Sequence, residues 1–252
     1  MHRSLAAVLC LMAGPALAEP LPTVVAARLA QPTLRYDHAV LGDGVEWGAL
    51  ELTIAPCAQC APPTAPDEKR KRLTIRLPLS RVFEDITVRV ADLNGDGAAE
   101  AVVVETDIAR GAALAVYDAL GHRAATASLG ATHRWLAPAG IADLDGDGQI
   151  EIAYVDRPHV SRELVILHYT GKQGATPAAL TEVARLPGLT NHRIGDSVIT
   201  GGVRTCAQGP ELLLLNPDWS RLISVRFDRG ALTTRDQGPF SPKSLKRAMA
   251  CR

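Results

Sequence analysis

Short apolar runs, rich in Val, Ile and Leu and separated by turn residues, recur along most of the chain. After Glu100, for example, come AVVVE, AALAVYDA and RAATASLG, separated by a turn at residues 107–111 and by Gly121. Runs of this length and composition predict β-strands joined by hairpins. Three such strands also follow Glu151 and Glu211. Helical periodicity is convincing only in residues 244–250, so the pattern predicts an all-β fold.

The strands belong to a repeat of about 50 residues. Four polar segments begin with aspartates that lie 49, 51 and 53 residues apart: Asp43, Asp92, Asp143 and Asp196. In the first three copies a glutamate follows the aspartate by eight residues: Glu51, Glu100 and Glu151. In the last copy Glu211 follows by 15 residues, across an insertion that includes Cys206.

Four antiparallel strands in each repeat are typical of the blades of a β-propeller. We therefore predict one domain, residues 19–252, with four or five four-stranded blades. Residues 22–36 could add an outer strand that closes the ring with the C-terminal blade. A two-sheet sandwich is the alternative, although the regular period favours the propeller.

The two central polar segments, DLNGDGAAE (92–100) and DLDGDGQIE (143–151), share the form D-x-[DN]-x-D-G-x-x-E. The glycine at position 6 allows a sharp turn, which brings the oxygens of positions 1, 3 and 5 together. Calcium prefers six to eight oxygen ligands and accepts backbone carbonyls. The predicted ligands are Asp92, Asn94, Asp96, the carbonyl of Ala98 and Glu100, then Asp143, Asp145, Asp147, the carbonyl of Gln149 and Glu151.

These loops differ from EF-hand loops, which have a glutamate at position 12 and lie between two helices. Position 12 is Val103 in one copy and Tyr154 in the other, so the calcium would lie in a hairpin between strands. A polar turn without metal is the alternative. The second loop has four carboxylates against three and an amide, and we expect it to bind more tightly. The segments at Asp43 and Asp196 lack the acidic positions 3 and 5, so no tight site is expected there.

The chain begins with a basic start, an apolar stretch at residues 5–12 and the sequence Ala16-Leu17-Ala18. This pattern predicts a signal peptide over residues 1–18 and export to the periplasm or the extracellular space. Four cysteines follow it: Cys57, Cys60, Cys206 and Cys251. Three pairings are possible, and we favour Cys57–Cys60 and Cys206–Cys251. Redox chemistry at Cys57–Cys60 would need a βαβ context, which the pattern lacks.

With 27 basic and 27 acidic residues the chain has no net charge, which gives no reason to expect a nucleic-acid partner. After the leader, no apolar stretch is long enough to span a membrane. No common catalytic motif occurs, and the histidines lack metal-ligand spacing, so we interpret them as surface or packing residues: His38, His133, His159, His168 and His192. We expect a monomer.

The acidic loops between strands, at a spacing of about 50 residues, resemble the FG-GAP and VCBS repeat family, to which the propeller of integrin α subunits belongs. The resemblance implies a propeller whose calcium loops are structural and lie on one face, with the ten ligands named above. Two hypotheses of function follow. The chain is either a non-catalytic binding or adhesion module for a protein or carbohydrate ligand, or a propeller hydrolase or lyase acting on polysaccharide. A purely structural subunit is a third.

Overall fold

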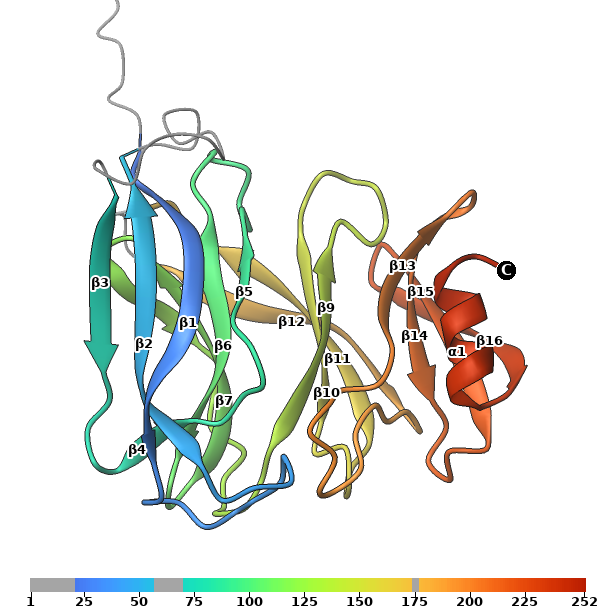
Figure 1. The fold of residues 1–252 in the computed structure, drawn as a ribbon. Helices are drawn as coiled ribbons and strands as arrows, with labels where there is room; N and C mark the ends of the chain where they lie inside the picture. Colours follow the sequence, from blue (N-terminus) through green and yellow to red (C-terminus); the bar gives the residue numbers. More distant parts are fainter. Residues whose placement is uncertain (1–20, 57–69, 174–176) are drawn as a thin grey trace, which may run out of the picture.

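The computed structural model describes residues 21–56, 70–173 and 177–252. In this part of the chain the fold is all-β, with sixteen strands and one short helix (Figure 1). The strands form three separate sheets of antiparallel strands, and none of the sheets closes on itself. The predicted signal peptide, the Cys57–Cys60 pair and the Pro-rich segment around it lie outside the described residues. No described helix is long and apolar enough to cross a membrane.

The first sheet contains eight strands from two of the predicted repeats. The two halves are joined by the short strand β4, which pairs with β2 through Trp47 and Phe83 and with β6 over three residues. The strands are β1 (Thr23–Thr33), β2 (Glu46–Ala55), β3 (Lys71–Arg76), β4 (Arg81–Phe83), β5 (Arg89–Ala91), β6 (Glu100–Asp107), β7 (Gly111–Asp118) and β8 (Gly121–Ala125).

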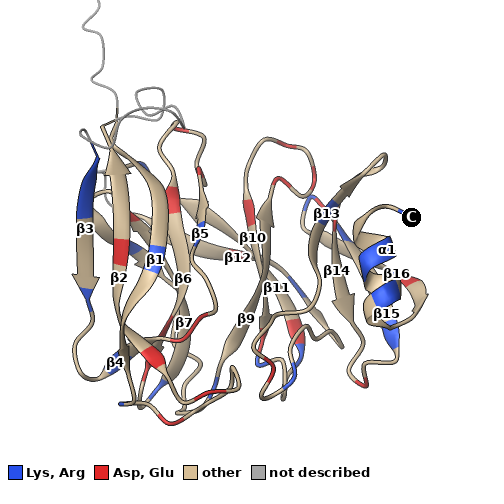
Figure 2. Ribbon diagram, in the orientation of Figure 1, with Lys and Arg blue, Asp and Glu red and all other residues tan. Residues whose placement is uncertain are grey.

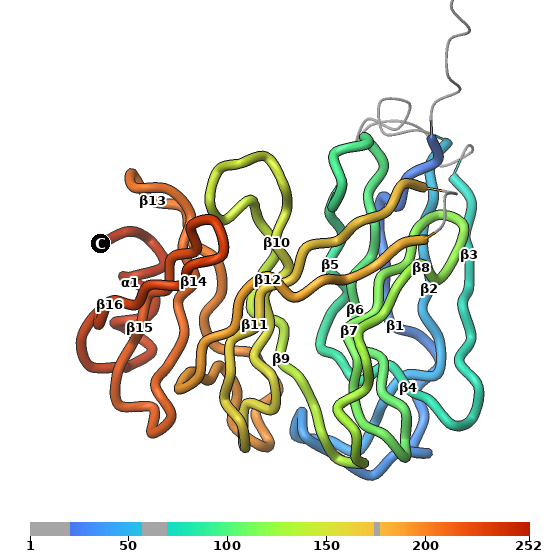
Figure 3. The backbone as a smooth tube through the Cα atoms, turned by 180° about the vertical axis from the view of Figure 1, so that it is seen from behind, coloured from blue at the N-terminus to red at the C-terminus, as the bar shows by residue number. Residues whose placement is uncertain are grey.

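The second and third sheets are four-stranded, and in each the strands pair in chain order. The second sheet contains β9 (Leu136–Ala142), β10 (Glu151–Asp156), β11 (Glu163–Thr170) and β12 (Ala179–Pro187). The third contains β13 (Gly202–Cys206), β14 (Gly209–Leu215), β15 (Arg221–Asp228) and β16 (Ala231–Pro239), and α1 (Pro242–Met249) follows it. Figure 3 shows the sheets side by side, with the third sheet and α1 at one end.

The strands with continuous apolar sequences lie between two hydrophobic cores. In β6, Val102 and Val104 face the core shared with the second sheet, whereas Ala101 and Val103 face the core of β1 and β2. Strand β10 alternates in the same way between the cores on its two sides, and so does β14. Successive side chains of a strand point to opposite faces. A strand buried on both faces therefore shows no alternation of apolar and polar residues.

Helix α1 begins at a capping box in which Ser241 and Ser244 each accept a hydrogen bond from the backbone N–H of the other, with Pro242 in the first turn. Leu245 and Ala248 pack against Leu213 and Leu215 of β14. The helix predicted at residues 244–250 is thus present, and it covers part of the outer face of the third sheet.

The predicted ring closure through residues 22–36 is wrong. Strand β1 pairs with β2 over nearly its whole length, from Thr23 opposite Ala55 to Thr33 opposite Glu46. The last strand, β16, pairs only with β15 among the described strands. A β-strand pattern predicts that a segment forms a strand but does not identify its neighbour. Here the next strand in sequence supplies the partner.

Candidate metal site

The first acidic loop, residues 92–99, joins β5 to β6 at the top of Figure 1. Asp92 shapes it, because its Oδ1 accepts a hydrogen bond from the N–H of Gly95 at 2.9 Å and its Oδ2 accepts one from Gly97 at 2.9 Å. Gly97, the position-6 glycine, has a φ of 86°. Glycine adopts this left-handed conformation without steric cost, so the turn is as sharp as the motif predicts.

The second acidic loop, residues 143–150, joins β9 to β10 at the same end of the molecule. Asp143 accepts hydrogen bonds from Gly146 at 2.7 Å and from Gly148 at 3.1 Å, and Gly148 has a φ of 90°. The two loops therefore share one conformation. Both lie in hairpins between antiparallel strands, as predicted from the sequence.

The side chains at positions 3 and 5 of both loops each accept a hydrogen bond from the backbone N–H two residues further on. The distances are 2.8 Å for Asn94, 2.9 Å for Asp96, 3.3 Å for Asp145 and 2.7 Å for Asp147. The N–H donors at position 7 belong to Ala98 and Gln149, whose carbonyls are the predicted backbone ligands. Each of these side chains keeps a second lone pair or a second oxygen for another partner.

Three of the predicted ligands converge in the second loop. One carboxylate oxygen from each of Asp143, Asp145 and Glu151 lies within 4.8 Å of the others. Asp147 is not part of this group, and its Oδ2 accepts a hydrogen bond from Gln149 Nε2 at 3.1 Å. Among the described residues this is the one cluster of three or more His, Cys, Asp or Glu side chains close enough to share a metal ion.

The first loop is arranged differently at position 3. The amide nitrogen of Asn94 donates to Glu100 Oε1 at 3.3 Å and to the carbonyl of Gly171 at 2.9 Å. Asp96 Oδ2 also accepts a hydrogen bond from the N–H of Gln173, at 3.3 Å. Asn94 and Asp96 therefore connect this loop to the segment between β11 and β12 of the second sheet.

The glutamates at position 9 are the buried members of both loops. Glu100 and Glu151 are 1 % and 0 % exposed, and each accepts a hydrogen bond from the backbone N–H of position 2, that of Leu93 or Leu144. Burial raises the pKa of Glu100 to about 7, and it also raises the pKa of Glu151. A buried carboxylate without a compensating positive charge is costly to ionise. His168, whose Nε2 lies 2.6 Å from Glu151 Oε1, supplies part of that compensation in the second loop.

The equivalent glutamates of the other two repeats have arginine partners on the preceding strand. Glu51 lies directly opposite Arg28, whose Nε donates to it at 2.9 Å. Glu211 lies directly opposite Arg204, whose Nε donates to it at 3.0 Å. Glu100 and Glu151, in the acidic loops, lie opposite alanines instead, namely Ala91 and Ala142. The missing arginine leaves room for a cation beside each of these two glutamates, and the converging carboxylates of the second loop fit one there.

The segments at the first and last predicted registers have different positions. Asp43 lies in the connection between β1 and β2, where its Oδ1 accepts a hydrogen bond from the N–H of Val45 at 2.9 Å. Asp196 lies between β12 and β13, before the third sheet, and the β13–β14 hairpin has no acidic loop. The sequence aligned Asp196 with the hairpin loops because it lies 53 residues after Asp143.

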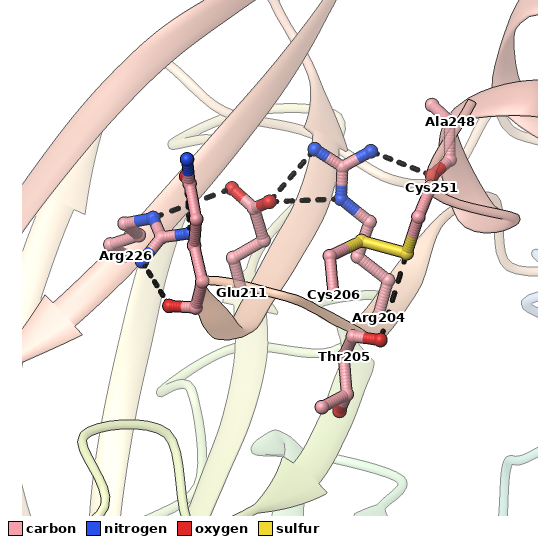
Figure 4. Close-up of a disulfide and its surroundings, with 8 residues drawn as sticks. Arg204, Thr205, Cys206, Glu211, Arg226, Ala248 and Cys251 are labelled. Carbon is pink, nitrogen blue, oxygen red and sulfur yellow. Dashed lines mark hydrogen bonds and ion pairs between the residues drawn. A yellow bond between two sulfur atoms is a disulfide. The ribbon is translucent and has the colours of Figure 1, made fainter.

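The predicted disulfide between Cys206 and Cys251 is present, with the Cα atoms 5.8 Å apart. It joins β13 to the residue that follows α1 by two positions (Figure 4). Arg204, two residues before Cys206, donates through Nη1 to the carbonyl of Ala248 at 2.6 Å. The end of α1 is therefore fixed to the third sheet by a covalent bond and a hydrogen bond.

Four histidines that are far apart in sequence lie together at the opposite end of the molecule, where residues 34–45 form the bottom of Figure 1. The rings of His38 and His133 are 5.1 Å apart, those of His159 and His192 are 5.2 Å apart, and both of the latter rings contact the buried Trp135. His159 Nε2 lies 3.0 Å from His192 Nδ1. Burial lowers the pKa of His159 to about 4. Spacing along the chain could not reveal this group, because its members come from four different connections.

Buried carboxylates accompany these histidines. Glu84 is fully buried and lies 2.6 Å from His38 Nδ1 through its Oε1, while its Oε2 accepts a hydrogen bond from the hydroxyl of Thr106. Glu46 is 2 % exposed, and burial, together with the nearby Glu84, raises its pKa to about 9. We name His38, Glu46, Glu84, His159 and His192 the histidine–carboxylate cluster. Strongly shifted pKa values of this kind are typical of functional sites but also of structural networks.

Comparison with known proteins gives no match to this chain among protein-family models, curated proteins or solved structures.

Proposed function

We propose that the chain is an exported, calcium-stabilised binding module of the FG-GAP/VCBS type, with its repeats arranged as the blades of a propeller. The observation that carries the proposal is the pattern at the four equivalent glutamates. Two of them lie opposite an arginine. The other two lie opposite an alanine, and each of these is directly preceded in the sequence by an acidic loop. A calcium ion in each loop would supply the positive charge that the arginine supplies elsewhere.

The ligands would be the oxygens of positions 1, 3 and 5, the carbonyl of position 7 and the glutamate of position 9. Calcium tolerates this mixture of carboxylate, amide and carbonyl oxygens. Its role would be structural, since both loops lie in hairpins at one end of the molecule and contact the neighbouring sheets. The surface for a protein or carbohydrate ligand would then be formed by the connections between strands.

Titration calorimetry of the oxidised chain with calcium tests this proposal. We expect two ions per chain, and a melting temperature that falls when a chelator is added. Calcium at a hundredfold above its dissociation constant stabilises the folded state by about 2.7 kcal/mol per site. Asp92→Ala and Asp143→Ala should each remove one ion, whereas Asp43→Ala, in a connection without the motif, should leave two. An unchanged stoichiometry in both loop variants would contradict the proposal.

A hydrolase or lyase acting on polysaccharide is the second candidate, and the histidine–carboxylate cluster is the observation that favours it. Glu46 is protonated at neutral pH when its pKa is about 9, and it could act as a general acid beside Glu84. Release of reducing ends from a panel of polysaccharides would test this function. Activity that Glu46→Gln abolishes and Asp92→Ala leaves intact would support it. Activity that survives in Glu46→Gln would assign the chemistry to other residues.

A further inference from the structure

The third sheet has an outer face that no other sheet covers in the described part of the chain. Leu212, Leu214 and Val225 point inward to the core shared with the second sheet. Leu213 and Leu215 point outward and are covered by α1. The rest of the outer face is polar, and Figure 2 shows basic residues along the helix beside it.

A cavity of about 330 Å³ lies in this polar part, next to the Cys206–Cys251 disulfide. Its charged lining is predominantly basic, with four arginines and one glutamate: Arg204, Arg226, Arg235, Arg252 and Glu211. Figure 4 shows Arg204, Glu211 and Arg226 in a row beside the disulfide. The cavity shares no residue with the loops 92–100 and 143–151, so its chemistry is independent of calcium binding.

The glutamate in the cavity is already neutralised. Arg204 donates to Glu211 Oε1 through Nε at 3.0 Å and lies 2.8 Å from it through Nη2, with both side chains less than a tenth exposed. Arg226 lies 3.8 Å from Glu211 Oε2 through its Nε, and its Nη1 and Nη2 donate to the backbone carbonyl and the side-chain oxygen of Gln208 at 2.7 Å and 3.3 Å. Each terminal nitrogen of a guanidinium carries two protons, so Arg226 keeps donors for a further partner.

Two other groups in the cavity have unused donors. Arg235 of β16 has no hydrogen-bond or ion-pair partner within the described residues. Ser224 is 2 % exposed and accepts a hydrogen bond from Gln237 Nε2 at 2.8 Å, while its own hydroxyl proton has no acceptor among those residues. A buried hydroxyl without an acceptor is costly. A ligand oxygen in the cavity would satisfy it.

We infer that this cavity binds a tetrahedral oxyanion, a sulfate or phosphate group, either as the free ion or as the ester of a small sugar. Arg226 and Arg235 would supply charge-assisted hydrogen bonds from the neighbouring strands β15 and β16, and Ser224, directly opposite Arg235, would donate from between them. Guanidinium groups suit such oxyanions because their donors form a planar fork. The disulfide and α1 form the wall that keeps Arg204 on Glu211 and away from the ligand.

Calorimetric titration with sodium sulfate, compared with sodium chloride at equal ionic strength, tests the inference. We expect saturable binding of sulfate that Arg235→Gln weakens about tenfold, the effect of one charge-assisted hydrogen bond. Lys243→Gln removes the same charge from α1 outside the cavity and should leave the affinity unchanged. Ser224→Ala should also weaken the binding of sulfate. Its effect on the melting temperature of the free protein should be no larger than the effect of Lys243→Gln.

Glucose 6-sulfate distinguishes the two sources of the anion. Tighter binding of the ester than of sulfate would assign a sugar ester, and weaker or equal binding would assign the free ion. Heats that sodium chloride reproduces, or an equal loss in Arg235→Gln and Lys243→Gln, would overturn the inference.

Discussion

Single residues determine how each buried carboxylate is compensated in this chain. An ionised carboxylate removed from water needs a positive charge, a proton or several hydrogen-bond donors. Glu211 has Arg204, and Glu46 has a raised pKa that keeps its proton. Glu151 has only His168 and a backbone N–H within the described structure, beside two aspartates that make ionisation harder. The residue that lies opposite each glutamate therefore predicts where a cation is needed.

Ala142→Arg should replace the calcium proposed for the second loop by a guanidinium. The new side chain would lie opposite Glu151, as Arg204 lies opposite Glu211. We expect the calcium stoichiometry measured by calorimetry to fall from two to one and the chelator to lower the melting temperature less. Ala142→Gln, of similar length but neutral, should keep both ions. Two ions in the arginine variant would argue that the glutamate is not the charge the calcium compensates.

Glu46 should make the stability of the fold depend on pH. Its carboxyl ionises at pH 4.5 in the unfolded chain and near pH 9 in the folded one, because it is buried beside Glu84. The contribution of this carboxyl to stability is fully present below pH 4.5 and is lost as the pH rises to 9. We expect the free energy of unfolding to fall by up to about 1.4 kcal/mol per pH unit across this range.

Denaturant unfolding of wild type and Glu46→Gln between pH 5 and pH 9 measures this effect. The neutral glutamine should flatten the curve and make the variant the more stable protein at pH 8. A wild-type curve as flat as that of the variant would show that Glu46 has an ordinary pKa.

At the scale of elements, the pattern of apolar runs and turn residues predicted the strands well. Most of these strands form hydrogen bonds with, and are buried beside, the strand that is next to them in the sequence. The hairpins β6–β7–β8, β10–β11–β12 and β14–β15–β16 follow the three predicted successions of strands. The helix and the Cys206–Cys251 bridge were also predictable, since a C-terminal cysteine after a short amphipathic segment can reach back to the body. The position of Asp196 was not, because β13 forms within what the sequence presented as an insertion.

Removal of the disulfide should lower stability without changing the sheets. Cys206 and Cys251 are separated by 45 residues, and the loop entropy of such a crosslink is about 4 kcal/mol. Cys251→Ser in the Cys206→Ser background should lower the free energy of unfolding by up to this amount, measured by urea denaturation. Wild type in the presence of a reductant should match the double variant. Equal stability of the oxidised and reduced proteins would indicate that α1 is fixed by Arg204 and apolar contacts alone.

At the scale of the whole molecule, the stability of the fold depends on how closely the three sheets pack. Gly140 of β9 lies where the second sheet meets the third, and a Cβ atom there would be 2.4 Å from Cγ2 of Val203 on β13. Atoms cannot approach so closely, so this position requires glycine as long as Val203 keeps its side chain.

Gly140→Ala should therefore destabilise the chain by about 1–3 kcal/mol, the usual cost of overpacking. Val203→Ala opens space at the same point, and the double variant should be more stable than the sum of the two single changes predicts. Thermal or denaturant unfolding of the four proteins gives the coupling energy. Strict additivity would mean that the two sheets are further apart than the structure indicates.

The sequence by itself determined the all-β class, the run of strands and the sharp turns at Gly97 and Gly148, and it favoured the pairing of Cys206 with Cys251 that the structure shows. These features depend on residues close together in the chain or on the few cysteines available. Only the tertiary structure decided that β1 pairs with β2, that Arg28 and Arg204 lie opposite glutamates, and that four histidines and four arginines gather in two separate places. Most of these contacts join distant residues: Arg28 and Glu51 are 23 positions apart, His159 and His192 are 33, and His38 and Glu84 are 46. They form because the sheets bury apolar faces against one another, and no local pattern records which side chains this packing brings together.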